Sequence, residues 1–256
     1  MKADYVIIGS GSAGSVMANR LSDSGKLSVI VIEFGGKDTS PLIQMPAALS
    51  YPMNMSKFDW GYKTEPEPHL NNRILATPRG KVMGGSSSIN GMVFIRGHAM
   101  DFDGWRQAGC EGWGYEDVLP YFKRMENYSA GDDAFRGSGG PLNVQRPCPA
   151  NPLIKAFIDA GKQAGYPLTD DINGYRQEGF GLLDSSVYQG ERWSTAKAYL
   201  DPARKNNNLK IVTDAYVQKL KVSGNVVSGV IYKDHLGQMQ NIDVRKEILL
   251  CAGAVG

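Results

Sequence analysis

The first residues that could do chemistry are three closely spaced glycines near the start of the chain. Residues 9–14 read Gly-Ser-Gly-Ser-Ala-Gly. In a turn between a strand and a helix, Gly9 permits a tight bend, Gly11 lets the backbone approach a pyrophosphate, and Gly14 lets the helix pack against the strand. The amino terminus of the helix adds N–H groups and a partial positive charge for the phosphates. About 20 residues further on, Glu33 offers a carboxylate that accepts hydrogen bonds from both hydroxyls of a ribose and repels a 2′-phosphate.

The neighbouring segments supply the elements that this turn requires. Residues 4–8 form a short apolar, β-branched run, which predicts a buried parallel strand. Residues 12–24 carry apolar side chains at helical spacing, and residues 28–32 predict a second strand that ends at Glu33. Strand, glycine turn, helix and acid together predict a dinucleotide site, with NAD and FAD both open. FAD is favoured because the motif opens the chain and because residues 34–79 do not continue the β–α alternation of an NAD domain.

The rest of the chain combines a helical middle with a β-rich end. Helices are expected to begin around residues 84–91 and to span 99–108, 115–127 and 151–165, with a Gly- and Asp-rich loop at 131–140. Pro120 is expected to kink or delay the helix over 115–127. Strands are expected at 209–213, 217–222, 226–232 and 247–251, with Gly224-Asn225 as a turn between two of them. Because the chain stops at Gly256, directly after a buried-type strand, we expect it to be the amino-terminal part of a longer protein.

Composition and charge exclude several classes of function. The chain has 256 residues, of which 42% are hydrophobic and 21% charged, as is ordinary for a globular protein. Its formal net charge is only +2 and its basic residues are dispersed, so it has no electrostatic footprint for nucleic acid. No run reaches the roughly 18 apolar residues of a membrane span, and no signal peptide is visible. We expect a cytoplasmic protein and leave a peripheral contact with the cytoplasmic face of the membrane open.

Neither the cysteines nor the histidines are spaced as metal ligands. Cys110, Cys148 and Cys251 are odd in number and far apart, which indicates a reducing compartment rather than a disulfide framework. The three histidines are isolated and are interpreted as surface or loop residues. No metal site is expected.

A second glycine-rich motif is more specific than the first. Residues 79–92 read Arg-Gly-Lys-Val-Met-Gly-Gly-Ser-Ser-Ser-Ile-Asn-Gly-Met. Two adjacent glycines can bring backbone amides close to a flavin, and the serines and the asparagine that follow offer small donors for phosphate and ring atoms. The stretch resembles the first signature of the glucose–methanol–choline (GMC) oxidoreductase family, and the similarity covers essentially the whole chain. An NAD-dependent dehydrogenase, the first rival interpretation, shares the first turn and Glu33 but gives no reason for this motif.

The resemblance implies an FAD site assembled from distant segments. Carried over position by position, the implied cofactor contacts are Gly9, Gly11, Ser12, Ala13, Gly14, Glu33, Val82, Gly85, Ser86, Asn90, Gly91, Met92, Val93, Val217, Ala252 and Gly253. The backbone of Val217 is implied to lie near the adenine, and Ala252 and Gly253 match a strand end that returns beside the cofactor. Some members carry a His at the position of Ile89 and attach the flavin covalently. Because Ile89 has no nucleophilic atom, noncovalent FAD is predicted here.

Within the family, several segments resemble the choline dehydrogenases. These segments are residues 62–73, 89–105, 169–181 and 191–200. The implied reaction is oxidation of a primary alcohol, choline to betaine aldehyde, by hydride transfer to flavin N5. Dehydrogenases of medium-chain aliphatic alcohols share the RGK, GGSSSIN and RWS elements, so another primary alcohol is the alternative substrate. The electron acceptor stays unknown.

The family's catalytic groups are not found in this chain. The resemblance places a His base and a partner His or Asn beyond Gly256, and none of His69, His98 or His235 matches them. No catalytic residue is therefore assigned, and the 256-residue chain alone is expected to bind FAD poorly and to oxidise no alcohol. A non-catalytic FAD-binding module, complete as it stands, is the rival interpretation from another class.

The resemblance also implies an α/β fold with two domains. A Rossmann-like FAD-binding domain with a parallel sheet is expected over residues 1–150 and 205–256. Residues 151–204 are expected to begin an α+β substrate domain whose antiparallel sheet is incomplete in this chain.

Overall fold

The computed structural model describes residues 1–148 and 151–255, which form two compact units. The first unit comprises Met1–Gly91 and the segment from Ser194 onward, and the second comprises Met92–Trp193. The units change over at residues 91 and 193, whereas the sequence analysis expected limits at 150 and 204. The difference arises because residues 92–148 pair with the segment that ends at Trp193, through strand Val93–Phe94 on strand Asp184–Ser185 and through the bridge between Gln145 and Ser185. The assignment of cofactor and substrate roles to the units stays a prediction.

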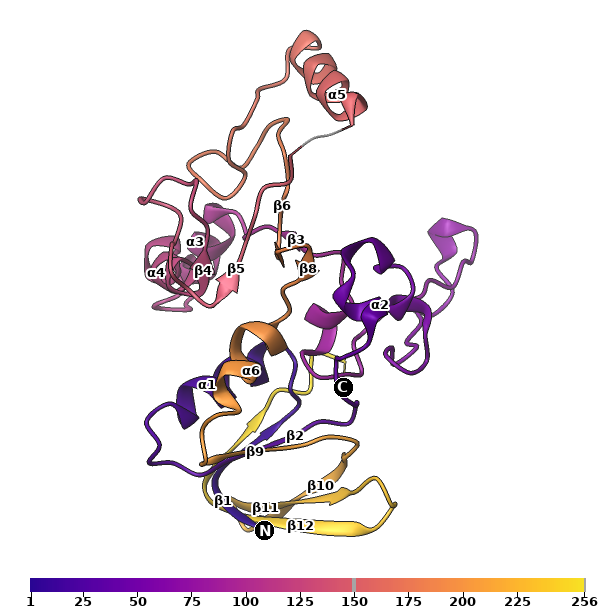
Figure 1. Ribbon diagram of the computed structural model, residues 1–256, viewed down its shortest axis with the longest axis vertical. Coiled ribbons are helices and arrows are strands. Elements are labelled where there is room, and N and C mark those ends of the chain that lie inside the picture. Colours follow the sequence, from indigo (N-terminus) through magenta and orange to yellow (C-terminus); the bar gives the residue numbers. More distant parts are fainter. Residues whose placement is uncertain (149–150, 256) are drawn as a thin grey trace. The chain divides into compact units, whose positions relative to one another are not determined.

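The first unit is built on one six-stranded sheet in the order β10-β11-β12-β1-β2-β9 (Figure 1). Its strands are β1 (Lys2–Ile8), β2 (Val29–Ile32), β9 (Leu209–Val212), β10 (Tyr216–Ser223), β11 (Val226–Lys233) and β12 (Met239–Leu250). Strands β12, β1, β2 and β9 run parallel, and β10 and β11 extend the sheet as an antiparallel hairpin. Strand β12 is longer than the expected 247–251, because its first residues pair with β11 before the strand continues beside β1. The expected α/β fold with a parallel sheet is confirmed.

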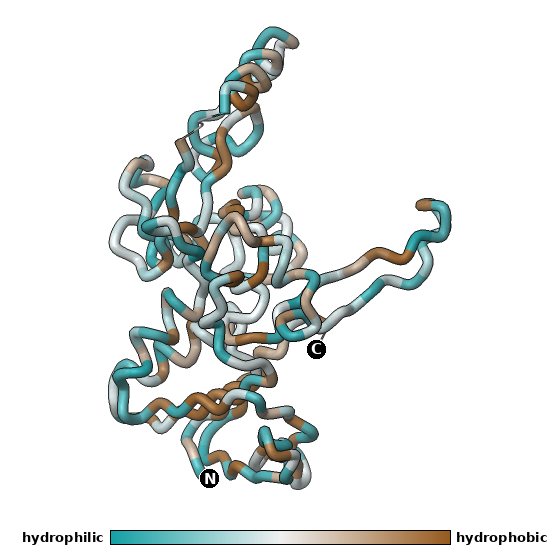
Figure 2. Tube along the Cα trace, turned by 45° about the vertical axis from the view of Figure 1, so that its right-hand side comes forward, coloured by the Kyte–Doolittle hydropathy of each residue, from teal (hydrophilic) through white to brown (hydrophobic). Residues whose placement is uncertain are grey.

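Both faces of the central strands are buried, which explains their unbroken apolar sequences. Ile7, Val29 and Val31 pack on one face against helix α1 (Ser12–Ser22) and the π-helix η5 (Ala196–Leu200). Ile30 and Ile32 point to the other face, into a cluster with residues of β11 and β12. Figure 2 shows these strands as strongly hydrophobic segments of the trace. Burial on two sides fixes the carboxyl ends of β1 and β2, where the glycine turn and Glu33 begin.

Between β2 and the second unit the chain forms only short helical turns. They are α2 (Pro41–Gln44), η1 (Pro46–Ala48), η2 (Pro52–Asn54), η3 (Pro68–Leu70) and η4 (Gly85–Ser88); α6 (Asp201–Ala203) follows η5. The helix expected to begin around residues 84–91 is wrong, since only the single 3₁₀ turn η4 forms there. Gly84 and Gly85 have φ angles of +83° and +55°, which a right-handed helix does not allow.

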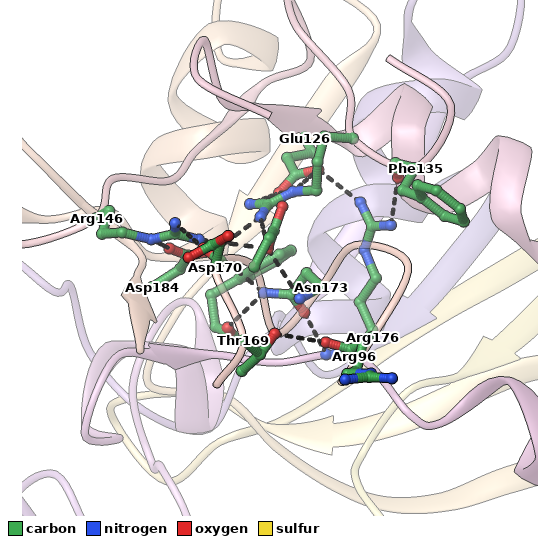
Figure 3. Close-up of polar contacts among 12 residues, drawn as sticks. Arg96, Glu126, Phe135, Arg146, Thr169, Asp170, Asn173, Arg176 and Asp184 are labelled. Atoms are coloured by element: carbon green, nitrogen blue, oxygen red, sulfur yellow. Dashed lines mark hydrogen bonds and ion pairs between the residues drawn. The ribbon is translucent and has the colours of Figure 1, made fainter. Parts of the chain in front are cut away.

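The second unit has helices and two-residue strands. Its elements are β3 (Val93–Phe94), α3 (Ala99–Gln107), α4 (Tyr115–Met125), β4 (Glu126–Asn127), β5 (Leu142–Asn143), α5 (Pro152–Gln163), β6 (Asp184–Ser185), β7 (Val187–Tyr188) and β8 (Glu191–Arg192). Helix α4 continues through Pro120. A buried polar network occupies the interior of this unit, where Glu126 lies between Arg96 and Arg136 and Asp184 joins them (Figure 3).

Two further findings bear on function. Over residues 1–148 and 151–255, every helix is too short or too polar to cross a membrane. In the same residues, no group of three or more His, Cys, Asp and Glu side chains is placed to hold a metal ion.

Candidate functional site

A cavity of about 620 Å³ opens at the carboxyl ends of β1, β2 and β12 in the first unit. Its size falls in the range of about 300–1,000 Å³ that is usual for small-molecule and cofactor sites. Ligands of parallel α/β sheets bind at this edge, outside the carboxyl ends of the strands. The cavity is therefore the candidate site.

The first glycine turn lines the cavity, and each of its glycines meets a different constraint. A Cβ atom on Gly9 would lie 2.4 Å from the carbonyl oxygen of Cys251, and one on Gly14 would lie 1.9 Å from the oxygen of Gly9. Both glycines are thus required by packing within the protein. A Cβ atom on Gly11 would meet only the Cα of Gly85, at 3.8 Å. Of the three glycines, only Gly11 has open space where a Cβ atom would lie.

The amino terminus of α1 has properties that favour the binding of an anion. Its N-cap is Gly11, which has no side chain to accept a hydrogen bond, and its first turn contains no acidic residue. The first N–H groups of a helix have no partner inside the helix and carry a partial positive charge. Because Gly11 and Ser12 both line the cavity, a phosphate group at this point would find donors without displacing a protein side chain.

The second glycine turn lies directly against the first. The N–H of Gly84 donates to the carbonyl oxygen of Ser10 at 3.0 Å. A Cβ atom on Gly85 would lie 2.7 Å from the Cα of Gly11, so the two backbones approach as closely as glycine allows. Gly85 and Ser86 line the same cavity as the first turn. Residues about seventy positions apart in sequence therefore border one site.

Thr195 fixes the second turn from outside the cavity. Its hydroxyl lies 2.8 Å from the hydroxyl of Ser87, and its N–H donates to the same Ser87 oxygen at 3.0 Å. The Ser87 hydroxyl in turn donates to the carbonyl oxygen of Gly84 at 2.6 Å. Residues 191–200 carry a family resemblance in the sequence, but this contact of Thr195 was not predicted from it. The signal was the Ser-Thr pair that follows Trp193, opposite the three serines of the second motif.

Glu33 stands at the edge of the cavity with its carboxylate largely enclosed. It is 6% exposed, and its Oε2 accepts hydrogen bonds at 2.8 Å from both the N–H and the hydroxyl of Ser10. Its Oε1 accepts from the N–H of Gly35 at 2.8 Å. Burial raises the pKa of Glu33 above its usual value, and the hydrogen bonds from Ser10 and Gly35 oppose that rise. These bonds orient the carboxylate, and Oε1, which accepts from Gly35, retains acceptor capacity for a ligand hydroxyl.

The structure brings nine of the sixteen expected contact residues to the cavity wall. These are Gly9, Gly11, Ser12, Glu33, Gly85, Ser86, Val217, Ala252 and Gly253. Ala13 and Gly14 lie in the first turn of α1, and Val82 is buried with Ile89 in a small apolar cluster. Asn90 and Gly91 are exposed, and Met92 and Val93 belong to the second unit. The role of all sixteen in cofactor binding stays a prediction.

Four aromatic residues of the cavity wall were missed. Phe34, Trp60, Tyr62 and Tyr216 all line the cavity. The sequence analysis treated residues 34–79 as irregular connecting chain. The signal was the concentration of aromatic residues in Phe-Asp-Trp-Gly-Tyr at positions 58–62, together with a phenylalanine directly after Glu33.

The geometry of the site is compatible with a dinucleotide. None of the three histidines lines the cavity. The open space at Gly11, the uncapped helix terminus and the enclosed carboxylate fit the pyrophosphate and ribose of such a cofactor.

Comparisons with known proteins find matches that cover nearly the whole chain. The sequence model of the family described as GMC oxidoreductase matches residues 3–256. The chain is 54% identical over 254 residues to the oxygen-dependent choline dehydrogenase of Sinorhizobium fredii and 56% identical over 256 residues to that of Brucella suis. These matches cover 99% and 100% of this chain and 46% of each relative, so the chain spans about half the length of the curated relatives it matches.

A solved structure shares the fold. The crystal structure of pyridoxine 4-oxidase from Mesorbium loti superposes with a TM-score of 0.93 at 36% sequence identity. The superposition covers 98% of this chain and 50% of that one.

Proposed function

Because the chain belongs to the GMC oxidoreductase family, we propose that it holds FAD noncovalently for the oxidation of a primary alcohol, choline to betaine aldehyde. The observation that carries the FAD site is the contact between the two glycine turns at one cavity. The choice of choline is supported by the 54–56% identity to proteins named choline dehydrogenases. Another primary alcohol is the alternative substrate.

In this proposal, different residues of the chain contact different parts of the cofactor. The backbone at Gly11 and the amino terminus of α1 bind the pyrophosphate, and Glu33 accepts hydrogen bonds from the ribose hydroxyls. The contact of Gly85 with Gly11, held by Thr195 through Ser87, keeps the second turn in place beside the cofactor. When bound, FAD supplies the acceptor for the hydride that leaves the alcohol carbon. We assign no proton acceptor for the alcohol within this chain, because the family resemblance implies a histidine base beyond Gly256.

We also propose how the flavin is attached and in which compartment the protein is found. Ile89 is 2% exposed and packs with Val82, and its side chain carries no nucleophile that could form a bond to flavin. The three cysteines are free, which supports a reducing compartment. We therefore place the protein in the cytoplasm, with a peripheral membrane contact as an addition for experiment to decide.

The test of the proposed function uses the protein expressed from its complete reading frame. We expect it to purify with a flavin absorbance at about 450 nm, to release all of that flavin on acid precipitation, and to reduce an artificial electron acceptor with choline. Flavin retained in the precipitate would contradict noncovalent binding. Absence of flavin together with tight NAD binding would favour an NAD-dependent dehydrogenase, and turnover of aliphatic alcohols but not choline would replace the substrate.

A pH dependence of FAD affinity follows from the raised pKa of Glu33. As the pH falls through that raised pKa, the carboxylate becomes protonated and loses acceptor capacity for the ribose, so the Kd for FAD should rise by about tenfold. The contribution of Glu33 to the stability of the cofactor-free fold has the opposite pH dependence. It is present below the unfolded-state pKa and is lost as the pH rises through the folded-state pKa.

The measurement is the Kd for FAD by titration between acid and neutral pH, with Glu33→Gln as the matched variant. The variant should bind weakly at every pH and should lack the acid limb of the wild-type curve. Parallel curves for the two proteins would contradict the role of Glu33.

A further inference from the structure

Three large aromatic side chains of the cavity wall remain exposed. Phe34 is 38% exposed, Trp60 36% and Tyr216 48%. We call these three residues the aromatic wall, and all of them line the 620 Å³ cavity. Exposed apolar surface gathered in a cavity marks a binding site rather than ordinary surface. A flat, apolar ligand group would remove this surface from water.

The rings of the aromatic wall are held in a fixed arrangement. Phe34 stacks on Trp60 with ring centroids 4.9 Å apart and planes at 20°, and it contacts Tyr216 at 4.9 Å with planes at 55°. The ammonium group of Lys81 lies 6.0 Å from the Phe34 centroid and 5.8 Å from that of Trp60. Trp60 is further supported by Tyr62, at 6.1 Å and 9°. A wall ordered before binding costs little entropy when a ligand stacks against it.

The position of the wall identifies the part of the cofactor that it faces. Phe34 directly follows Glu33, and Glu33 is the residue placed for the diol of a ring-closed ribose. In FAD that ribose belongs to the adenosine half, because the flavin half carries an open ribityl chain. The base attached to this ribose must therefore lie within reach of Phe34. Tyr216 approaches from β10, where the pairing with β11 shifts register between Val217 and Lys219, a bulge at the rim of the cavity.

We propose that the aromatic wall of Phe34, Trp60 and Tyr216 binds the adenine ring of the cofactor by stacking. This inference rests on the proposed function, since it needs a dinucleotide with its pyrophosphate at α1. Stacking of one base on aromatic side chains changes affinity by about tenfold or more when the aromatic residue is removed. The wall is thus a positioning device that fixes the adenine end while the two glycine turns hold the middle of the cofactor.

The test compares FAD with ADP, which has the adenine, ribose and pyrophosphate but no flavin. In the protein from the complete reading frame, Trp60→Leu should weaken FAD and ADP alike, by about tenfold, and Trp60→Phe should restore most of both affinities. The matched control is Trp113→Leu in the second unit, where Trp113 is 54% exposed and lies outside the cavity lining. The control should change neither Kd. Titration calorimetry gives both constants, and a thermal melt of each variant without cofactor reports folding.

Each outcome decides the inference. Equal losses for FAD and ADP, with an unchanged melting temperature and rescue by Trp60→Phe, would support it. A loss for FAD but not for ADP would overturn it, because the rings would then face the flavin, and so would unchanged affinity for both. Losses that accompany a lower melting temperature without rescue would also overturn it, as a purely structural role. Wild-type protein that binds ADP but neither FAD nor choline would end the proposed function and leave the wall's adenine contact standing.

Discussion

Gly11→Ala is expected to weaken FAD binding by about a hundredfold, ~2.7 kcal/mol, while the melting temperature of the cofactor-free protein stays the same. The added methyl group has room in the protein, because its nearest neighbour is the Cα of Gly85 at 3.8 Å. Gly11 also has a φ of −65°, which alanine adopts without strain. The methyl group instead occupies the space through which the pyrophosphate would approach the backbone. Titration of both proteins with FAD measures the effect.

Gly14→Ala in the same turn is the control for a change that acts on the fold. Its Cβ would lie 1.9 Å from the carbonyl oxygen of Gly9, so α1 would have to move away from the turn. Overpacking of this kind typically costs about 1–3 kcal/mol of stability, and the melting temperature should fall. If Gly11→Ala lowered the melting temperature as Gly14→Ala does, or if it left FAD affinity unchanged, the assignment of Gly11 to the ligand would fail.

The cofactor turn could be predicted from sequence because its determinants are local. The strand, the three glycines and the helix occupy consecutive positions, and Gly9 and Gly14 stand where a Cβ atom would clash with the backbone. The same holds for the hairpin of β10 and β11, whose two-residue turn Gly224-Asn225 stands between Ser223 and Val226 as expected. Local rules also explain the failure at Gly84 and Gly85. The serine-rich sequence that follows these glycines resembles the start of a helix. Two successive residues with positive φ angles, however, cannot belong to a regular right-handed helix.

The features that sequence did not predict depend on pairings over long distances in the chain. The wall residues Phe34, Trp60 and Tyr216 come from three separate segments, and no periodicity links them. The limits of the two compact units differ from the expected domain limits for the same reason, because the bridge between Gln145 and Ser185 has no local signal. The family resemblance compensated for part of this by naming Val217, Ala252 and Gly253, which the structure places on the cavity wall.

The buried network of the second unit is the largest feature without a sequence signal (Figure 3). Glu126 is fully buried and accepts hydrogen bonds from the guanidinium groups of Arg96 and Arg136, each at 2.5 Å. Arg136 also reaches Asp171 at 2.7 Å and Asp184 at 2.9 Å, and its guanidinium carbon lies 3.9 Å from the centre of the Tyr128 ring. From the sequence alone, these charged side chains would be predicted to lie at the protein surface. In the interior of the second unit they lie beside the apolar cluster of Phe94, Tyr128 and Val144.

Glu126→Gln is therefore expected to destabilise the protein by about 3–5 kcal/mol, the usual cost of removing one partner from a buried ion pair. The glutamine amide would present N–H groups to the donors of Arg96 and Arg136 and would leave two buried guanidinium groups without their shared carboxylate. Its single oxygen could accept either from the N–H of Gly137, now 3.1 Å from Oε2 of Glu126, or from the Arg136 donor at Oε1, but not from both. The measurement is the free energy of unfolding of the second unit by chemical denaturation.

The matched control for Glu126→Gln is Asp159→Asn, which removes a carboxylate from a pair at the surface. Asp159 lies 2.7 Å from Lys155 on α5, and the two side chains are 49% and 80% exposed. Water and salt screen such a pair, so its loss should leave the unfolding transition unchanged. Equal effects of the two substitutions would show that the network contributes no more than a surface contact. A large loss confined to Glu126→Gln would show that the buried ion pairs contribute to the stability of the second unit in addition to its apolar cluster of Phe94, Tyr128 and Val144.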